Sequence, residues 1–378
     1  MIPTEEQVMI RDMARAFAAE QIAPFAGEWE DKAYFPAEVF KAMGKLGLMG
    51  MTVPEEWGGA GLDYVTYAMA LEEIAAGDGA IAIVMSGHNS VGCMPILEYG
   101  TSAQKEQYLR RLTMGEILCA FALTEAKGGS DASALTTRAV RDDDGYVING
   151  SKQFITTGKN ADLTLVFAVT DPDAGKRGIS AFIVPTDTPG YEVVRLEEKM
   201  GLNASDTAQL AFTDMRLPHD ALLGEEGQGY RIALGNLEGG RIGIASQALG
   251  MARAAYEAAL AYAQEREAFG KPIIEHQAVA FRLADMATQL EAARQLIWHA
   301  AARRSAGLKC LTEASMAKLF ATDMAEKVCS EAMQTLGGYG FLRDFPVERY
   351  YRGVRGARIY EGTNDIQKLV IARDIAAD

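Results

Sequence analysis

A block of short β-type runs between two helical stretches is the feature that most limits the fold of this chain. Residues 120–228 contain runs such as "LTLVFAVT" and "ISAFIVPT", separated by turn segments such as "RDDDG" and "DTPG". The flanking residues are rich in Ala, Glu, Met and Leu at helical spacing. The sequence therefore predicts an α+β protein in the order α, β, α: an N-terminal helical domain (1–119), a middle β-barrel or sandwich domain (120–228) and a C-terminal four-helix bundle (229–378).

Local signals give finer expectations within this order. Thr101 or Ser102 is suited to cap a helix whose polar first turn includes Gln104. Asn149 and Gly150 form a dipeptide typical of a hairpin turn. In the last domain an apolar stripe at spacings of four and three predicts a long helix packed lengthwise on others; its members are Val279, Leu283, Met286, Leu290, Ala293 and Ile297.

Charge and composition exclude several classes of function. The formal net charge of -14 argues against general binding to nucleic acid or to an anionic membrane surface. The four cysteines lie far apart and the four histidines are not at metal-ligand spacing, so neither a disulfide framework nor a metal site is expected. We expect no basic leader at its start and no uncharged apolar run of 18 residues anywhere in the chain. We expect a soluble, cytoplasmic protein without a membrane span.

Two glycine-rich segments could bind a ligand. In "FALTEAKGGSDASA" (121–134), Gly128, Gly129 and Ser130 would let backbone N–H groups and a hydroxyl approach a flat or anionic ligand, although the segment could equally be a mobile connector. In "QTLGGYGF" (334–341), Gly337 could simply end a helix.

A third candidate is the acid in "RIYEGTNDIQ" (358–367). Gly362, Thr363 and the residues after them are turn and helix-cap types, so Glu361 is predicted to lie between the end of one helix and the start of the next. Such a carboxylate can be reactive or merely solvated. The residues alone leave both interpretations open.

These segments together resemble the acyl-CoA dehydrogenases, flavin enzymes that introduce a double bond beside an acyl thioester. "ALTEAKGGSDASA" and "QTLGGYGFLRDFPVERYYRG" are similar to the family's two most specific motifs, and "REAFGKPIIEHQ", "KMGLNASDT" and "RIYEGTNDIQ" match further stretches in the same order. The resemblance covers nearly the whole chain. It departs at Gly353, where the family usually has an acid, and we expect a local salt bridge to be weakened there.

The resemblance assigns Glu361 as the catalytic base. It would take the α-hydrogen while the β-hydrogen leaves as hydride to N5 of FAD. Some relatives carry the base just before an arginine on an earlier helix. That position is Gly240 here, preceding Arg241, so the task falls on Glu361.

The resemblance also implies contacts to FAD and to the substrate. Phe154 stands where many members have tryptophan, which keeps a flat ring but loses an N–H donor. Gln247 is bulky enough to help close the acyl pocket, which favours a short straight or methyl-branched acyl group. The implied FAD contacts are Phe121, Leu123, Thr124, Ser130, Phe154, Thr156, Arg266, Phe269, Gln277, Gln334, Gly337, Gly338, Thr363, Asn364 and Asp365. The implied acyl-CoA contacts are Ser130, Glu238, Arg241 and Gly362.

The family's partners are expected here too: electron-transfer flavoprotein as electron acceptor, and further copies of the chain in a homotetramer built as a dimer of dimers. The pathway could be fatty acid β-oxidation, branched-chain amino acid catabolism or xenobiotic breakdown. Two alternatives remain at this stage. The same fold could serve a flavin-dependent oxygenase, oxidase or desulfinase, or it could be a helical scaffold without flavin.

Overall fold

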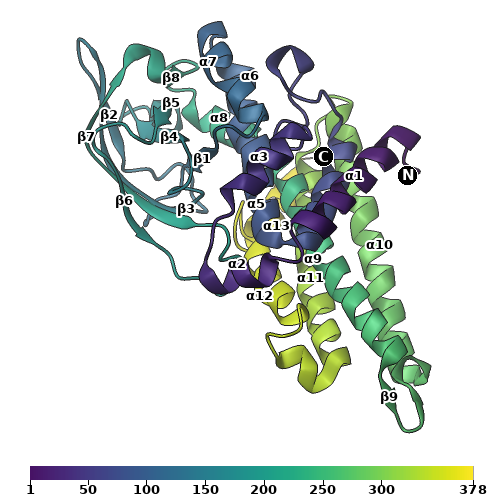
Figure 1. The fold of residues 1–378 in the computed structure, drawn as a ribbon. Helices are drawn as coiled ribbons and strands as arrows, with labels where there is room; N and C mark the ends of the chain where they lie inside the picture. Colours follow the sequence, from purple (N-terminus) through teal and green to yellow (C-terminus); the bar gives the residue numbers. More distant parts are fainter. Residues whose placement is uncertain (378) are drawn as a thin grey trace.

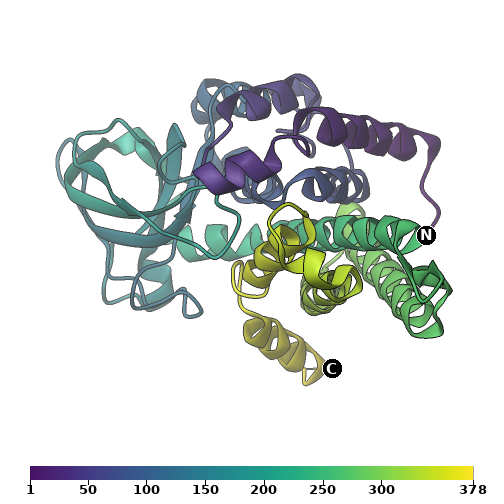
Figure 2. The ribbon, with the colours of Figure 1, turned by 60° about the horizontal axis from the view of Figure 1, so that its bottom comes forward.

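The α, β, α order predicted from the sequence is confirmed. The computed structural model describes residues 1–377. Figure 1 shows the β strands gathered at one side and long helices extending away from them. In Figure 2 the N-terminal and C-terminal helices lie against each other, with the β domain beside both. The site described below lies among these helices.

The N-terminal helices start at capping residues. The Thr101 side chain accepts a hydrogen bond from the backbone N–H of Gln104, whose side chain bonds back to Thr101, so the predicted cap is confirmed. Asp63 and Asp78 cap two buried helices earlier in this domain, Tyr64–Gly77 and Gly79–Gly87. The elements are α1 (Glu5–Gln21), α2 (Ala26–Lys32), α3 (Ala37–Lys45), η1 (Glu55–Trp57), α4 (Tyr64–Gly77), α5 (Gly79–Gly87), the π-helical turn η2 (His88–Cys93), α6 (Met94–Tyr99) and α7 (Ser102–Thr113).

One continuous helical stretch corrects the expectation that no long apolar run exists. Gly79–Tyr99 is 21 residues long with a mean hydropathy of 1.4, which is long and apolar enough to cross a membrane. However, 78% of its most apolar window is buried inside the protein. A stretch surrounded by other elements of the same chain is a core helix, and its apolar composition is explained by that position.

The middle domain is one eight-stranded sheet in the order β6-β7-β3-β2-β4-β5-β8, with β1 pairing in parallel with β4. Its strands are β1 (Cys119–Ala122), β2 (Arg138–Arg141), β3 (Gly145–Thr156), β4 (Leu163–Val169), β5 (Ile179–Pro185), β6 (Tyr191–Leu196), β7 (Thr207–Pro218) and β8 (Leu222–Leu223). The short turns η3 (Gly175–Gly178) and η4 (His219–Ala221) lie between them.

Strand β4 explains why the strands of this sheet appear in the sequence as continuous apolar runs. All seven of its residues are buried, because both faces of the sheet are covered. Leu165 and Phe167 pack in the cluster shared with the N-terminal helices, and Val166 and Ala168 pack in the cluster inside the sheet.

The hairpin turn predicted at Asn149 and Gly150 is wrong. Strand β3 runs through both residues, and its pairing with β7 shifts register between Ile148 and Gly150. The Asn149 side chain exchanges hydrogen bonds with Asp214 on the neighbouring strand, and a Cβ on Gly150 would lie 2.5 Å from Thr137 Oγ1. The dipeptide therefore forms a bulge beside a close strand contact. The chain turns instead between β2 and β3.

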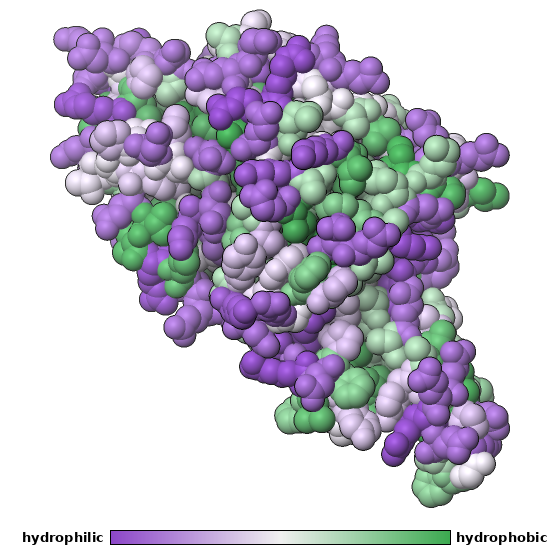
Figure 3. Space-filling view, in the orientation of Figure 1, coloured by the Kyte–Doolittle hydropathy of each residue, from purple (hydrophilic) through white to green (hydrophobic). Residues whose placement is uncertain are grey.

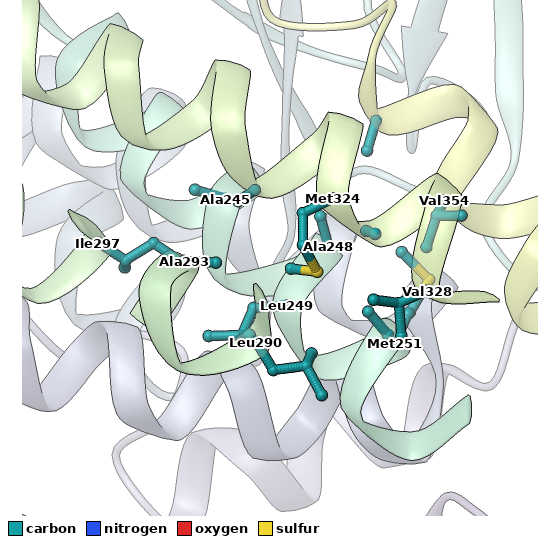
Figure 4. Packing of buried hydrophobic residues seen from close by; sticks show 14 of the residues in the cluster. Ala245, Ala248, Leu249, Met251, Leu290, Ala293, Ile297, Met324, Val328 and Val354 are labelled. Carbon is teal, nitrogen blue, oxygen red and sulfur yellow. The ribbon is translucent and has the colours of Figure 1, made fainter. Parts of the chain in front are cut away.

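Long helices form the C-terminal bundle. All members of the predicted stripe lie on one helix and are buried, apart from the half-buried Val279. Figure 4 shows Leu290, Ala293 and Ile297 meeting side chains from two neighbouring helices. The elements are α8 (Gly229–Gly235), α9 (Leu237–Glu265), β9 (Glu267–Ala268), β10 (Lys271–Pro272), η5 (Ile273–Glu275), α10 (Gln277–Ser305), α11 (Leu311–Leu336), η6 (Gly337–Phe341), α12 (Val347–Ala357) and α13 (Asn364–Ile375).

Gly353 on α12 is buried in an apolar contact. A Cβ at this position would lie 3.1 Å from both Leu202 Cδ2 and Met251 Sδ. A carboxylate side chain would have to enter this contact. The glycine thus fits the packing of α12, while the neighbouring Arg352 still pairs with Glu30 and Glu348.

Candidate active site

Glu361 lies in the short loop between α12 and α13. Helix α12 ends at Ala357 and α13 begins at Asn364, with the Thr363 side chain as its cap. The backbone of Glu361 has a φ of 52°, a conformation that few non-glycine residues adopt. Such strain persists where the surrounding structure imposes it, and it often marks a functional residue.

The carboxylate of Glu361 points into the protein rather than into solvent. Its Oε2 atom is buried and has no hydrogen-bond partner within residues 1–377. Burial raises the pKa of Glu361 to about 7, while the positive charges of Lys318 and Arg241 act in the opposite direction. An acid near neutrality can exchange a proton with a bound molecule.

Glycines on α9 make room for this carboxylate. A Cβ on Gly240 would lie 2.0 Å from Glu361 Oε2, and one on Gly243 would lie 2.1 Å from Ser86 Oγ and 2.8 Å from the hydroxyl of Tyr67. The acid, α5 and α4 can therefore approach the backbone of α9 only because these side chains are absent. Gly240, the alternative location of the base in the sequence analysis, is the surface on which the Glu361 carboxylate rests.

The peptide between Glu361 and Gly362 is fixed by Gln367. The side-chain amide of Gln367 donates to the carbonyl oxygens of Glu361 at 3.2 Å and of Gly362 at 2.8 Å. In a trans peptide the N–H points away from the carbonyl of the same unit, so the N–H of Gly362 faces away from Gln367. It donates to no other protein group in the described part of the chain. It is therefore available to a ligand.

Glu238 and Arg241 lie one turn apart near the start of α9. Arg241 is buried; its Nη1 donates to Ser315 Oγ at 3.3 Å, and its Nε has no partner within residues 1–377. Glu238 pairs with Arg304 at 3.2 Å and accepts a hydrogen bond from Cys310. Buried polar atoms without partners beside the acid indicate a site that is completed by a ligand.

Gln247 lies on α9 about two turns beyond Gly240 and is fully buried. Its Nε2 donates to the carbonyl of Gly79 at 2.7 Å, and its Oε1 accepts from the Tyr360 hydroxyl at 3.0 Å. Both ends of the amide are thus fixed. Because Tyr360 precedes Glu361, this amide is held close to the loop that carries the acid.

The first group of predicted FAD residues lies at the ends of two β strands. Phe121 is in β1, Leu123 and Thr124 follow it, and Thr124 accepts a 2.8 Å backbone hydrogen bond from Gln153 in β3. Phe154 has a φ of 59° and a side chain that is 62% exposed. An exposed aromatic ring held on a strained strand is suited to packing against a flat ligand. The structure also places Thr156 at the end of β3, and the exposed Ser130 in the loop after Thr124.

A buried ion pair that the sequence analysis missed supports this group. Lys152 Nζ contacts the Glu125 carboxylate at 2.8 Å, and both side chains are almost fully buried. The same ammonium donates to the carbonyl of Leu123, and Glu125 also accepts from Thr136 and Thr137. No local pattern signals this pair, because Glu125 lies in the loop after β1 whereas Lys152 lies in β3.

The second group of predicted FAD residues lies at the far end of the bundle. Arg266, Gly337 and Gly338 line a cavity of about 510 Å³. A Cβ on either glycine would meet nothing within 4 Å, so the backbone there is open. Phe269, at the turn of the β9–β10 hairpin, is 97% exposed. Gln277 begins α10, and Gln334 lies in the last turn of α11.

The two groups are far apart within one chain. In Figure 1 the β9 end of the bundle lies at the lower right, and the β domain lies at the upper left. The loop of Glu361 occupies neither end. Asn364 is hydrogen-bonded within the protein through its side chain and its N–H, and the Thr363 side chain caps α13, whereas Asp365 is exposed.

Three family models cover most of the chain. The N-terminal, middle and C-terminal domain models of acyl-CoA dehydrogenase match residues 4–116, 120–215 and 227–376. The chain belongs to the acyl-CoA dehydrogenase family. It is therefore an FAD-dependent oxidoreductase.

Relatives of known name agree with this membership. An acyl-CoA dehydrogenase of Bacillus subtilis is 51% identical over 98% of this chain and 98% of its own length. The mitochondrial short-chain specific acyl-CoA dehydrogenase of Bos taurus is 47% identical over 97% of this chain and 89% of its own length.

Two solved structures are also similar to this chain over nearly their full length. Butyryl-CoA dehydrogenase from Megasphaera elsdenii superimposes with a TM-score of 0.97 at 42% identity, over 100% of this chain and 99% of that one. A chain in a structure of the electron transferring flavoprotein of Acidaminococcus fermentans superimposes with a TM-score of 0.98 at 45% identity and covers 100% of both chains.

In this acyl-CoA dehydrogenase, both groups of predicted FAD residues have the properties that binding of FAD requires. The open backbone at Gly337 and Gly338 and the guanidinium of Arg266 suit a diphosphate, which needs close approach and positive charge. The exposed ring of Phe154 suits a flat heterocycle.

Proposed function

We propose that this enzyme converts a short-chain or methyl-branched acyl-CoA thioester to the trans-2-enoyl-CoA, with Glu361 removing the α-proton. The observation that carries the proposal is the buried carboxylate of Glu361, which has an unpaired Oε2 and a pKa raised to about 7. A base works best when its pKa lies near the working pH. A solvated loop acid would have neither property.

The groups around Glu361 account for the rest of the proton chemistry. The N–H of Gly362 would donate to the thioester carbonyl and stabilise the negative charge that develops there. The α C–H bond breaks toward Glu361, its electron pair forms the new double bond, and the β-hydrogen leaves with its own electron pair. FAD, when bound, supplies the acceptor for that hydride at N5.

We propose that the FAD site is shared between two copies of the chain. The β-domain residues, including Phe154 and Thr156, would meet the flavin ring, whereas Arg266, Gly337 and Gly338 would meet the ADP part of a cofactor held by a partner. The separation of these groups in Figure 1 supports this arrangement. Figure 3 shows hydrophobic residues among charged ones at the lower end of the bundle. The exposed apolar side chains of this domain include those of Phe269 and Phe341, at 97% and 82%. A homotetramer built as a dimer of dimers would cover them.

The fixed amide of Gln247 supports a short acyl group. A side chain held at both ends cannot swing aside to admit a longer chain. The names of the bovine short-chain relative and of the Megasphaera butyryl-CoA dehydrogenase support the same choice. The pathway would be fatty acid β-oxidation or branched-chain amino acid catabolism, in the cytoplasm.

We also propose electron-transfer flavoprotein as the electron acceptor. The similarity to a chain in the structure of an electron transferring flavoprotein supports this partner. The electrons must leave the flavin through a soluble carrier if the enzyme is to turn over.

The test is anaerobic titration of the purified holoenzyme with butyryl-CoA, isobutyryl-CoA and 2-methylbutyryl-CoA, followed by flavin absorbance and by mass analysis of the thioester. We expect one of them to bleach the flavin with formation of one enoyl-CoA per flavin. Turnover that needs oxygen and leaves the flavin oxidised under nitrogen would favour the oxidase or oxygenase alternative. A purified protein that contains no flavin would contradict both the dehydrogenase function and the oxidase or oxygenase alternative.

A further inference from the structure

Helix α11 presents a row of buried polar residues toward the loop that carries Glu361. Ser315, Lys318 and Thr322 follow one another at spacings of three and four, so they share one face of the helix, and all three are fully buried. The residues between them are apolar: Met316, Ala317, Leu319, Phe320 and Ala321. Polar residues in the middle of an apolar helix need partners, and here those partners belong to the site.

The ammonium group of Lys318 is bonded to the loop itself. Its Nζ donates to the carbonyl of Gly362 at 3.0 Å and to Oδ1 of Asn364 at 2.9 Å. Thr322 also contacts Asn364 Oδ1, at 3.1 Å. Both acceptors of the lysine are neutral oxygens. A buried ammonium without a directly bonded carboxylate is costly, so its position calls for an explanation.

The loop is thereby held from two sides. The carbonyl oxygen of Gly362 accepts hydrogen bonds from Lys318 on α11 and from Gln367 on α13. The peptide on the other side of Gly362 is fixed by Gln367 through the carbonyl of Glu361. The orientation of the acid and of the Gly362 N–H thus depends on these two side chains.

The same ammonium is the largest favourable charge acting on Glu361. Arg241 on α9 acts in the same direction more weakly, and burial opposes both. The charged or titratable groups that face Glu361 or Lys318 are Arg241 on α9, Tyr67 on α4, Asp323 on α11, Arg358 at the end of α12 and Tyr360 beside the acid.

We propose that Lys318 is a positioning residue for the reaction: its ammonium anchors the 361–364 loop through Gly362 and Asn364 and places a positive charge beside the loop that carries Glu361. The proposal rests on the proposed role of Glu361 as the base. Lys318 does not touch the reacting atoms, and it acts through the loop and through its charge.

The experiment compares Lys318→Met, which removes charge and hydrogen bonds at similar length, with Lys318→Gln, which removes the charge but keeps a donor. Lys327→Met is the matched control, because Lys327 lies on the same helix but is 58% exposed and pairs with the exposed Asp285. Each holoenzyme is checked for FAD content and Tm. The readouts are hydrogen exchange of residues 358–366 and the pH profile of anaerobic flavin reduction by the preferred acyl-CoA.

We expect exchange of residues 358–366 to become roughly 10-fold faster in Lys318→Met and to stay near wild type in Lys318→Gln and Lys327→Met. Loss of the positive charge makes Glu361 harder to ionise, so the acid limb of the pH profile should move up by about one unit in both Lys318 variants. A lysine that only stabilises the fold would lower Tm without moving that limb.

An unchanged acid limb in Lys318→Gln overturns the role of the charge, and unchanged exchange in Lys318→Met overturns the anchoring. If Lys318→Met does not fold, Lys318→Gln decides the proposal through its pH profile. A wild-type enzyme that no acyl-CoA bleaches would refute the proposed function instead, and the exchange measurement would still decide whether Lys318 anchors the loop.

Discussion

The carboxylate of Glu361 lies directly against the backbone of Gly240, so closely that a Cβ at position 240 would be 2.0 Å from Oε2. The two residues are far apart in the sequence and meet because the α12–α13 loop closes over α9. We therefore expect Gly240 to be needed for function, because a larger residue at this position would displace the carboxylate.

Gly240→Ala should therefore slow flavin reduction while leaving the fold intact. The atoms that the new methyl meets are at the end of a flexible side chain, so the carboxylate moves and the helix does not. A displacement of about 1 Å costs on the order of 10²-fold in rate. Rapid-mixing measurement of anaerobic flavin reduction checks this. Gly239→Ala is the control, because its methyl meets only ordinary contacts at 3.4 Å or more. Equal rates in the two variants would contradict the prediction.

Glu361→Gln should retain FAD and acyl-CoA binding and lose roughly 10² to 10⁴-fold in the rate of flavin reduction. The amide keeps the size of the side chain but cannot accept the proton. In the wild type, the rate should rise with pH through about 7, where the acid ionises. Bleaching of the variant at the wild-type rate would place the base elsewhere.

The free energy of unfolding should also change with pH, because the pKa of Glu361 differs between the folded and unfolded states. Burial raises the pKa of Glu361 from 4.5 to about 7, so its contribution to stability is full below 4.5 and is lost as the pH rises through about 7. Glu361→Gln lacks this titration and should gain about 3 kcal/mol relative to wild type above that range. Thermal unfolding of both holoenzymes across this pH range measures the difference. Glu38→Gln, a change at an exposed acid on α3, should show no such trend.

Gln247→Ala should shift substrate preference toward longer acyl chains. Removing the fixed amide opens space beside Tyr360 and Gly79. The ratio of kcat/KM for hexanoyl-CoA to that for butyryl-CoA should rise by about 10-fold, the scale set by one or two methylenes in an apolar pocket. Tyr360→Phe removes one hydrogen bond without adding space and should keep the short-chain preference. A matching shift in Tyr360→Phe would mean that the hydrogen bond, not volume, sets the limit.

Arg266→Ala should weaken FAD retention without changing the protein fold. Its guanidinium lines the cavity beside Gly337 and Gly338, where it would pair with a diphosphate. Dilution of the holoenzyme followed by measurement of released flavin checks this. Lys41→Ala, which removes an exposed cation of the N-terminal domain, should leave retention unchanged.

Patterns formed by residues close together in the sequence were sufficient to predict much of the fold. The Thr101 cap, the stripe on α10 and the position of Glu361 between two helices all rest on residues within a few turns of each other. Asn149 and Gly150 misled the analysis because a distant residue, Asp214, satisfies the Asn149 side chain in an extended strand.

The buried contacts that hold the site in place could not be predicted in the same way. The contacts of Lys318 with Gly362 and of Lys152 with Glu125 join elements that meet only in the folded chain. One signal was present for the first of them. Ser315, Lys318 and Thr322 break an Ala-rich run at helical spacing, which indicates a buried polar face without identifying what it holds.

The glycines at the start of α9 also make this part of the helix depend on its neighbours. Each glycine in a helix interior costs about 1 kcal/mol relative to alanine, so a segment with Gly239, Gly240 and Gly243 has little tendency to be helical by itself. Helices α4 and α5 pack on α9 and stabilise it there. The surface on which the acid rests therefore exists only where the two helical domains are joined, and neither domain alone would carry it.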